Sequence, residues 1–163
     1  EAAKAAGALL SFDPNLRPPL WDSMDRARDK MSYGCSVSDT VKIEIDELRF
    51  LTGCDDANKA VEIFGKRYPN VSLLTVTAGR NGSRAYYKDT YAEAPTFLNV
   101  KTVDTTGAGD TFMGYFVGCL ARGMERQTAM QYASMASAIS VTRPGAAASI
   151  PLMDEVRAAV EAL

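Results

Sequence analysis

The chain has 163 residues, of which 47% are hydrophobic and 23% charged, and its formal net charge is −2. This mixture is typical of a globular domain with a buried core, and the near balance of charges argues against nucleic acid or an anionic membrane as a partner. Histidine is absent, which removes Ser-His-Asp and Cys-His catalytic pairs and most zinc sites. Acid–base chemistry must therefore fall to Asp, Glu, Lys, Tyr or Cys.

Helix and strand signals alternate through the first half of the chain. The stretch "EAAKAAGALL" is typical of a helix that ends at Gly7 before a strand. Because this helix is entered in mid-course, we expect the chain to be part of a longer protein, with an engineered helical linker as the alternative. The proline-rich residues 16–21 predict a loop. A buried strand is expected at 8–13, a second strand at 39–43, and helices at 21–34, 46–53 and 55–68.

Glycine and aspartate mark the expected ends of two of these helices. Gly34 is predicted to stop the first of them. Asp46 is suited to cap the next helix, and Gly53 to end it.

The second half continues the alternation. Residues 71–79 form a continuous run rich in β-branched residues, which indicates a strand buried on both faces of a parallel sheet. Strands at 83–89 and 90–95 could pair as a hairpin through Asp89–Thr90. Helices are expected at 107–123, 126–143 and 151–163, the last with Pro151 in its first turn. The sum is an α/β fold with a largely parallel sheet.

The stretch "VDTTGAGD" (103–110) places small residues directly before an aspartate at the start of a helix. Gly107 and Gly109 allow backbone conformations that are barred to other residues. The first N–H groups of a helix lack internal partners, and the helix dipole adds positive potential there. Together these features predict an anion hole, with Asp110 beside it as a proton acceptor. Such a combination suits phosphoryl transfer.

This motif alone leaves other interpretations open. Glycines before a helix commonly make a simple turn, and Asp near a helix start is a common cap. A dinucleotide-binding loop is a third option, although residues 107–114 miss the usual spacing of the third glycine and no second βαβ unit carrying a ribose-binding acid follows. A Walker A loop is excluded because no Gly-Lys-Ser/Thr is present.

Five stretches, taken in order, resemble the ribokinase-like (PfkB) family of sugar kinases over nearly the whole chain. "DTTGAGDTF" (104–112) matches the family's second signature at every fixed position. "FDPNLRPPLW" (12–21) is similar to a segment of fructokinases and 2-keto-3-deoxygluconate kinases. "VKIEIDELRFLTG" (41–53), "VTAGRNGSRAYY" (76–87) and "AISVTRPGAAASIP" (138–151) resemble further family segments. Several ordered motifs are more specific than any one of them.

The resemblance implies a ribokinase-like, Rossmann-type three-layer α/β/α fold. Residues 1–163 would be its C-terminal nucleotide-binding and catalytic part, and the N-terminal sugar-binding half and the β-sheet lid would be absent. Because lid closure completes such sites, we expect the chain alone to be a poor catalyst. A homodimer is a possibility for the full-length protein, since family members often dimerise through the lid.

The resemblance also implies roles for individual residues. Asp110 would be the catalytic base that acts on the sugar, beside an anion hole for the γ-phosphoryl group made by the N–H groups of Gly107, Ala108 and Gly109. A monovalent cation, usually K⁺, would be held by Asp104, Thr106, the carbonyls of Ser140, Arg143 and Gly145, and the Ser149 hydroxyl.

The remaining implied roles concern the nucleotide and the sugar. Thr77, Gly79 and Gly82 would lie along ATP, with Ser134 near the adenine. Glu47 would act on Mg²⁺ through water, and Asn15 and Arg17 would face the sugar or phosphate. Glu44 departs from the pattern, because the family often has Asn there, and Pro144 occupies a variable loop position.

The implied activity is ATP-dependent phosphorylation of a sugar primary hydroxyl, with fructose converted to fructose 6-phosphate as the leading expectation. A kinase for 2-keto-3-deoxygluconate or another sugar is the alternative within the family. The alternative of another class is a nucleotide-binding fragment that has lost catalysis. Three cysteines, Cys35, Cys54 and Cys119, lack metal-type spacing and favour reduced thiols in a cytoplasmic protein.

Overall fold

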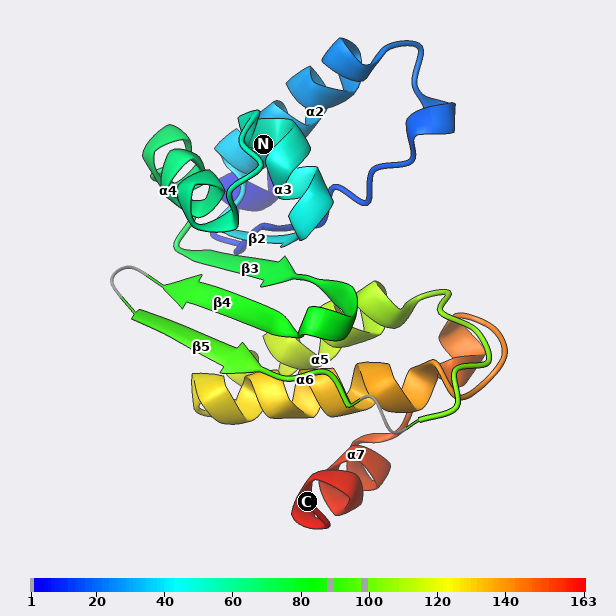
Figure 1. Cartoon of the computed structure of the whole chain (residues 1–163). Coiled ribbons are helices and arrows are strands. Elements are labelled where there is room, and N and C mark those ends of the chain that lie inside the picture. Colours follow the sequence, from blue (N-terminus) through cyan, green and yellow to red (C-terminus); the bar gives the residue numbers. More distant parts are fainter. Residues whose placement is uncertain (1, 88–89, 98–99) are drawn as a thin grey trace. The chain divides into compact units, whose positions relative to one another are not determined.

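The computed structural model describes residues 2–87, 90–97 and 100–163 and divides into two compact units (Figure 1). The first unit contains residues 1–78 and 85–91, and the second contains residues 79–84 and 92–163. Within the described residues, none of the helices has the length and apolarity that crossing a bilayer requires.

The elements alternate along the chain much as the sequence predicts. Their bounds are α1 (Ala2–Ala5), β1 (Ser11–Phe12), the short 3₁₀ turn η1 (Pro18–Leu20), α2 (Met24–Val37), β2 (Thr40–Glu44), α3 (Ile45–Thr52), α4 (Ala57–Arg67), β3 (Leu73–Thr77), η2 (Gly79–Asn81), β4 (Ser83–Tyr87), β5 (Thr90–Ala94), α5 (Ala108–Ala121), α6 (Arg126–Ser140), η3 (Ala147–Ser149) and α7 (Met153–Glu161).

The five strands form one sheet in the order β1-β2-β3-β4-β5. The first three are parallel, as predicted. Figure 1 shows β4 running opposite to β3, and β5 opposite to β4, so the sheet is mixed. Both predicted strands of the hairpin are present, but Asp89 of its predicted turn lies outside the described residues.

Apolar residues from β2, β3 and three helices form the core of the first unit. Val41 and Ile43 of β2 are fully buried, and β3 is buried along most of its length, as its continuous run rich in β-branched residues predicts. Leu48 of α3 and Phe64 of α4 pack into the same cluster. Cys35 of α2 joins them, and burial raises the pKa of its thiol to about 12, so this cysteine acts as a small packing residue.

Helices α5, α6 and α7 carry the core of the second unit. Phe112 and Phe116 of α5 are buried, and α6 contributes small buried residues that allow close helix packing, among them Ala129 and Ala133. Val156 of α7 is fully buried against α6.

Four expectations about element ends are wrong. The strand predicted at 8–13 covers only Ser11–Phe12, which pairs with β2, and Leu9 outside it is 82% exposed. Asp46 does not cap α3 but lies in its first turn, and the cap is Glu44. The expectation for the other end of this helix is confirmed, because Gly53 ends it at φ 71°. Pro151 precedes the cap of α7. Gly34 does not stop α2, which continues to Val37.

Gly34 is needed inside α2 because the Phe12 ring occupies the space of a side chain. A Cβ at this position would lie 2.4 Å from two ring carbons. We therefore expect Gly34→Ala to lower the free energy of unfolding by about 1–3 kcal/mol, the usual cost of overpacking. Urea denaturation measures this change.

Gly65→Ala in α4 is the matched control, since a Cβ there meets nothing within 4 Å. Removing a helical glycine in open space should stabilise by up to about 1 kcal/mol. Equal urea midpoints for the two variants would contradict the steric account of Gly34.

Candidate active site

Gly107 begins helix α5 in a left-handed conformation. It is the cap of the helix at φ 76°, a region that costs an ordinary L-residue roughly 1–2 kcal/mol. A Cβ at Gly107 would meet Ala146 at 3.4 Å, which is ordinary contact. The backbone conformation, rather than lack of space, therefore requires glycine here.

The backbone of the first turn partly fits the predicted anion hole. The Gly107 carbonyl accepts from the Thr111 N–H at 2.8 Å, which starts the helix, and the Ala108 N–H donates to the Thr105 carbonyl at 3.2 Å. No group among the described residues accepts from the N–H of Gly107 or Gly109. Two of the three predicted donors are thus unengaged by protein, and the third closes a turn.

Asp110 lies in the first turn of α5 and is exposed. Its carboxylate is therefore close in sequence and space to the positive end of the helix dipole. The role of Asp110 as a base stays a prediction.

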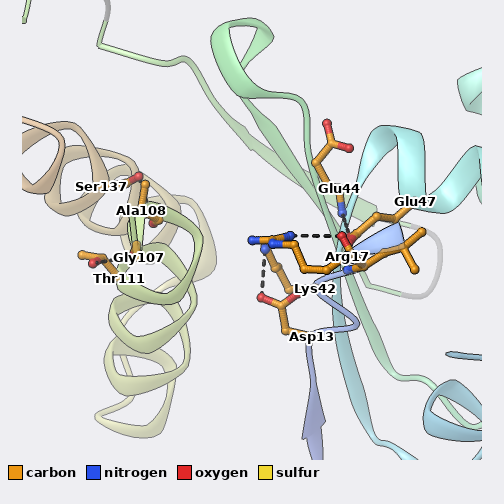
Figure 2. Close-up of polar contacts among 10 residues, drawn as sticks. Asp13, Arg17, Lys42, Glu44, Glu47, Gly107, Ala108, Thr111 and Ser137 are labelled. Atoms are coloured by element: carbon orange, nitrogen blue, oxygen red, sulfur yellow. Dashed lines mark hydrogen bonds and ion pairs between the residues drawn. The ribbon is translucent and has the colours of Figure 1, made fainter. Parts of the chain in front are cut away.

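Two hydroxyls that the sequence prediction missed hold carbonyls of the same turn (Figure 2). The Thr111 Oγ1 donates to the Gly107 carbonyl at 2.9 Å, and the Ser137 Oγ of α6 donates to the Ala108 carbonyl at 3.1 Å. The spacing of four residues between Gly107 and Thr111 is a signal the sequence does offer. The Ser137 contact depends on how α5 and α6 pack.

The segment before α5 is tied to the segment after α6. The Asp104 carboxylate accepts from the Thr106 N–H at 2.9 Å and from the Gly145 N–H at 3.0 Å. The Val141 carbonyl accepts from the N–H groups of Val103 and Asp104. The structure thus brings together Asp104, Thr106 and Gly145, as the predicted cation site requires.

The other residues expected to hold a cation lie in the same segment or beside it. The Ser140 carbonyl accepts from the Arg143 N–H at 3.1 Å, and the Arg143 side chain forms an ion pair with Glu155 of α7. The Ser149 hydroxyl is fully buried and donates to the Ala146 carbonyl at 2.7 Å, so its lone pairs remain available.

The donor set around Asp104 suits a hard cation. Hydrogen bonds from Thr106, and then from the Gly145 N–H, lower the pKa of the Asp104 carboxyl below its ordinary value, so the group is ionised at neutral pH. Carboxylate, carbonyl and hydroxyl oxygens are the ligands that such cations prefer. The residues present therefore fit the predicted site.

Because the Asp104 carboxylate accepts these hydrogen bonds, the stability of the folded chain should depend on pH in the acid range. A carboxyl whose folded pKa is lowered adds stability above its unfolded pKa of about 3.9, and this stability is lost as the pH falls toward the folded pKa. We expect Asp104→Asn to have a lower melting temperature than wild type at pH 7, and this difference to shrink as the pH falls below about 4. Thermal unfolding between pH 3 and pH 7 measures it, with the exposed Asp29→Asn as control. A difference in melting temperature between Asp104→Asn and wild type that stays constant from pH 3 to pH 7 would contradict this expectation.

Gly79 and Gly82 shape the turn between β3 and β4. Both have positive φ, at 51° and 84°, and the Gly82 N–H donates to the Gly79 carbonyl at 3.2 Å. A Cβ at Gly82 would lie 2.5 Å from the Ala94 carbonyl oxygen, so only glycine fits. Thr77 is the last residue of β3 and belongs to the first unit.

Ser134 is buried on α6, and its hydroxyl donates to the Pro95 carbonyl at 2.6 Å. This bond attaches α6 to the segment after β5. Its position near an adenine stays a prediction.

Glu47 links the loop that carries Asn15 and Arg17 to the end of β2 (Figure 2). One of its carboxylate oxygens accepts from the Leu16 N–H at 2.5 Å, and the other from the Glu44 N–H at 2.9 Å. Asn15 adopts a left-handed φ of 45°, and both Asn15 and Arg17 are exposed. A carboxylate has further lone pairs, so Glu47 still fits a water-mediated role toward Mg²⁺.

The sequence prediction also missed a buried ion pair in this unit. The Lys42 Nζ lies 2.8 Å from the Asp13 Oδ2, and the two side chains are only 9% and 21% exposed. Lys42 stands between the apolar residues Val41 and Ile43 of β2, which is the signal that could have indicated a partner. Glu44, where the family often has Asn, uses its side chain to cap α3.

The chain has a ribokinase-like α/β fold. It is similar to the fructokinase of Xylella fastidiosa solved with bound ATP (29% identity, TM-score 0.84, covering 98% of this chain and 54% of that one). It is also similar to the Vibrio cholerae fructokinase solved with fructose, ADP and calcium (27% identity, TM-score 0.85, covering 96% and 52%).

The family model described as "pfkB family carbohydrate kinase" matches residues 1–153, and the chain belongs to this family. It is 41% identical to "Probable fructokinase-7" of Arabidopsis thaliana over 95% of this chain and 47% of that protein. It thus spans about half the length of this relative, and likewise of "Fructokinase-1" of Oryza sativa subsp. japonica. Membership in this family favours the interpretation of residues 107–110 as part of a kinase signature over their interpretation as a dinucleotide-binding loop.

Proposed function

We propose that this chain is the C-terminal nucleotide-binding and catalytic part of an ATP-dependent sugar kinase. The observation that carries the proposal is the start of α5, where a left-handed Gly107 and two unengaged N–H groups precede the exposed Asp110. Family membership supports it independently.

In this proposal Asp110 accepts the proton of a sugar primary hydroxyl as the hydroxyl oxygen bonds to the γ-phosphorus of ATP. The bond from that phosphorus to the β,γ-bridging oxygen breaks, and ADP leaves. The N–H groups of Gly107 and Gly109 hold the anionic charge, with Ala108 as a third donor once its weak bond to Thr105 opens. Phosphoryl transfer depends mainly on such positioning and charge stabilisation.

The proposed reaction uses ATP as the phosphoryl donor, with K⁺ and Mg²⁺ as bound cations. Asp104, Thr106, Ser140, Arg143, Gly145 and Ser149 would hold K⁺, and Glu47 would act on Mg²⁺ through water. When bound, the cations supply positive charge beside the phosphates. Relatives solved with ATP and Mg²⁺, or with ADP and calcium, support the need for a divalent ion.

We propose fructose as the sugar. Support comes from relatives named fructokinases at 38–41% identity and from the resemblance of residues 12–21. A kinase for 2-keto-3-deoxygluconate remains the second candidate, because that segment is similar in both groups. A cytoplasmic location is proposed on the three free cysteines.

A coupled ADP-release assay of the full-length protein over a panel of sugars tests the proposal. Fructose should give the highest kcat/KM, and 2-keto-3-deoxygluconate should give little turnover. The chain of 163 residues, assayed alone, should be much slower because it lacks the lid. ATP binding without turnover of any sugar by the full-length protein would instead favour a non-catalytic nucleotide-binding protein.

A further inference from the structure

We propose that Thr111 and Ser137 are positioning residues that orient the anion hole at the start of α5. This inference rests on the proposed function, because it assigns these hydroxyls a role in phosphoryl transfer. Neither residue touches the reacting groups in this account. Each acts through a backbone carbonyl of the loop.

The two hydroxyls hold consecutive carbonyls. Thr111 Oγ1 donates to the Gly107 carbonyl at 2.9 Å, and Ser137 Oγ donates to the Ala108 carbonyl at 3.1 Å. Figure 2 shows these four residues together, with Ser137 reaching α5 from the neighbouring helix. Both hydroxyls are at least partly removed from solvent, and Thr111 is only 1% exposed.

Planarity of the peptide bond turns these contacts into control of the N–H groups. The Gly107 carbonyl shares a plane with the Ala108 N–H, and the Ala108 carbonyl shares a plane with the Gly109 N–H. In a trans peptide the C=O and the N–H point in opposite directions. A hydroxyl that fixes the direction of the carbonyl therefore also fixes the direction of the N–H. The unengaged Gly109 N–H is the donor whose direction Ser137 sets.

The first turn of α5 is poor in side chains that could restrain it, so the two hydroxyls add to the helical bond that the Gly107 carbonyl accepts from the Thr111 N–H. Gly107, Ala108 and Gly109 have no side chains large enough to restrain the backbone, and glycine has the greatest conformational freedom. An anion hole is effective only when its donors are already aimed at the developing charge. A threonine bonded four residues back is common in helices, but Ser137 comes from α6, and the two together fix adjacent planes.

The test compares Thr111→Val, which removes the hydroxyl at nearly constant shape, with Thr111→Ser, which keeps it. Ser137→Ala is tested alongside. In the full-length protein we expect Thr111→Val and Ser137→Ala each to lower kcat about tenfold or more, with the KM for ATP and the melting temperature little changed. Thr111→Ser should recover most of the activity.

Wild-type kcat for Thr111→Val and Ser137→Ala, in an active wild-type protein, would overturn the inference. So would equal losses for Thr111→Val and Thr111→Ser. Absence of turnover in wild type itself would refute the proposed function instead. In that case amide hydrogen exchange decides the positioning role. Faster exchange at the amides of residues 111 and 112 in Thr111→Val and Ser137→Ala would support it, and unchanged exchange would overturn it.

Discussion

Asp110→Asn in the full-length protein is expected to lower kcat by roughly 10²- to 10⁴-fold, the usual contribution of a general base. The amide cannot take the proton of the attacking hydroxyl, yet it has the same shape and stays exposed in the first turn of α5. Affinity for ATP and the melting temperature should therefore stay near wild type. Steady-state ADP release measures kcat, calorimetric titration with ATP measures the affinity, and thermal unfolding measures the melting temperature.

Asp154→Asn is the matched control for this variant. Asp154 is also an exposed carboxylate in the first turn of a helix, α7, where its partner is the exposed Arg157. If the loss of kcat in Asp110→Asn came only from the lost interaction between a carboxylate and a helix dipole, Asp154→Asn would lose kcat to the same extent. Activity of Asp110→Asn within a few-fold of wild type would remove the assignment of Asp110 as the base.

Lys42→Met is expected to cost about 3 kcal/mol of stability or more, since it leaves the Asp13 carboxylate buried without its partner. The second oxygen of that carboxylate, Oδ1, is already buried and has no hydrogen-bond partner among the described residues. An uncompensated charge at this place would have only the limited hydration open to a side chain that is 21% exposed. Urea denaturation measures the loss.

Two comparisons separate charge burial from loss of packing. The double variant Asp13→Leu with Lys42→Met should recover much of the loss, because two apolar side chains can replace a buried pair at little cost. Arg157→Met, which breaks the exposed pair with Asp154, should change stability by less than about 1 kcal/mol. A double variant as unstable as Lys42→Met would show that packing, not the unpaired charge, sets the cost.

Local patterns in the sequence predict most of the elements. The continuous run of β3, rich in β-branched residues, and the glycine that ends α3 carry their structural meaning within a few residues. Gly34 is different, because its role depends on the Phe12 ring from another element. A local pattern identifies it as a helix stop, and only the packing of β1 against α2 explains why the helix continues.

The features of the site likewise divide into those that a local sequence pattern predicts and those that depend on contacts between distant segments. The glycines and the aspartate at the start of α5 are adjacent in sequence, so their chemistry could be predicted. The Asp13–Lys42 pair follows from the parallel register that sets Phe12 beside Val41, which no single stretch reveals. The bond from Ser137 to Ala108 likewise depends on the packing of α6 against α5.

ADP release by the full-length protein with fructose and ATP tests the central claim most directly. The account predicts saturable, fructose-dependent turnover that needs Mg²⁺, increases with K⁺, and falls by roughly 10²- to 10⁴-fold in Asp110→Asn. Fructose-independent ADP release, or turnover of Asp110→Asn within a few-fold of wild type, would contradict it.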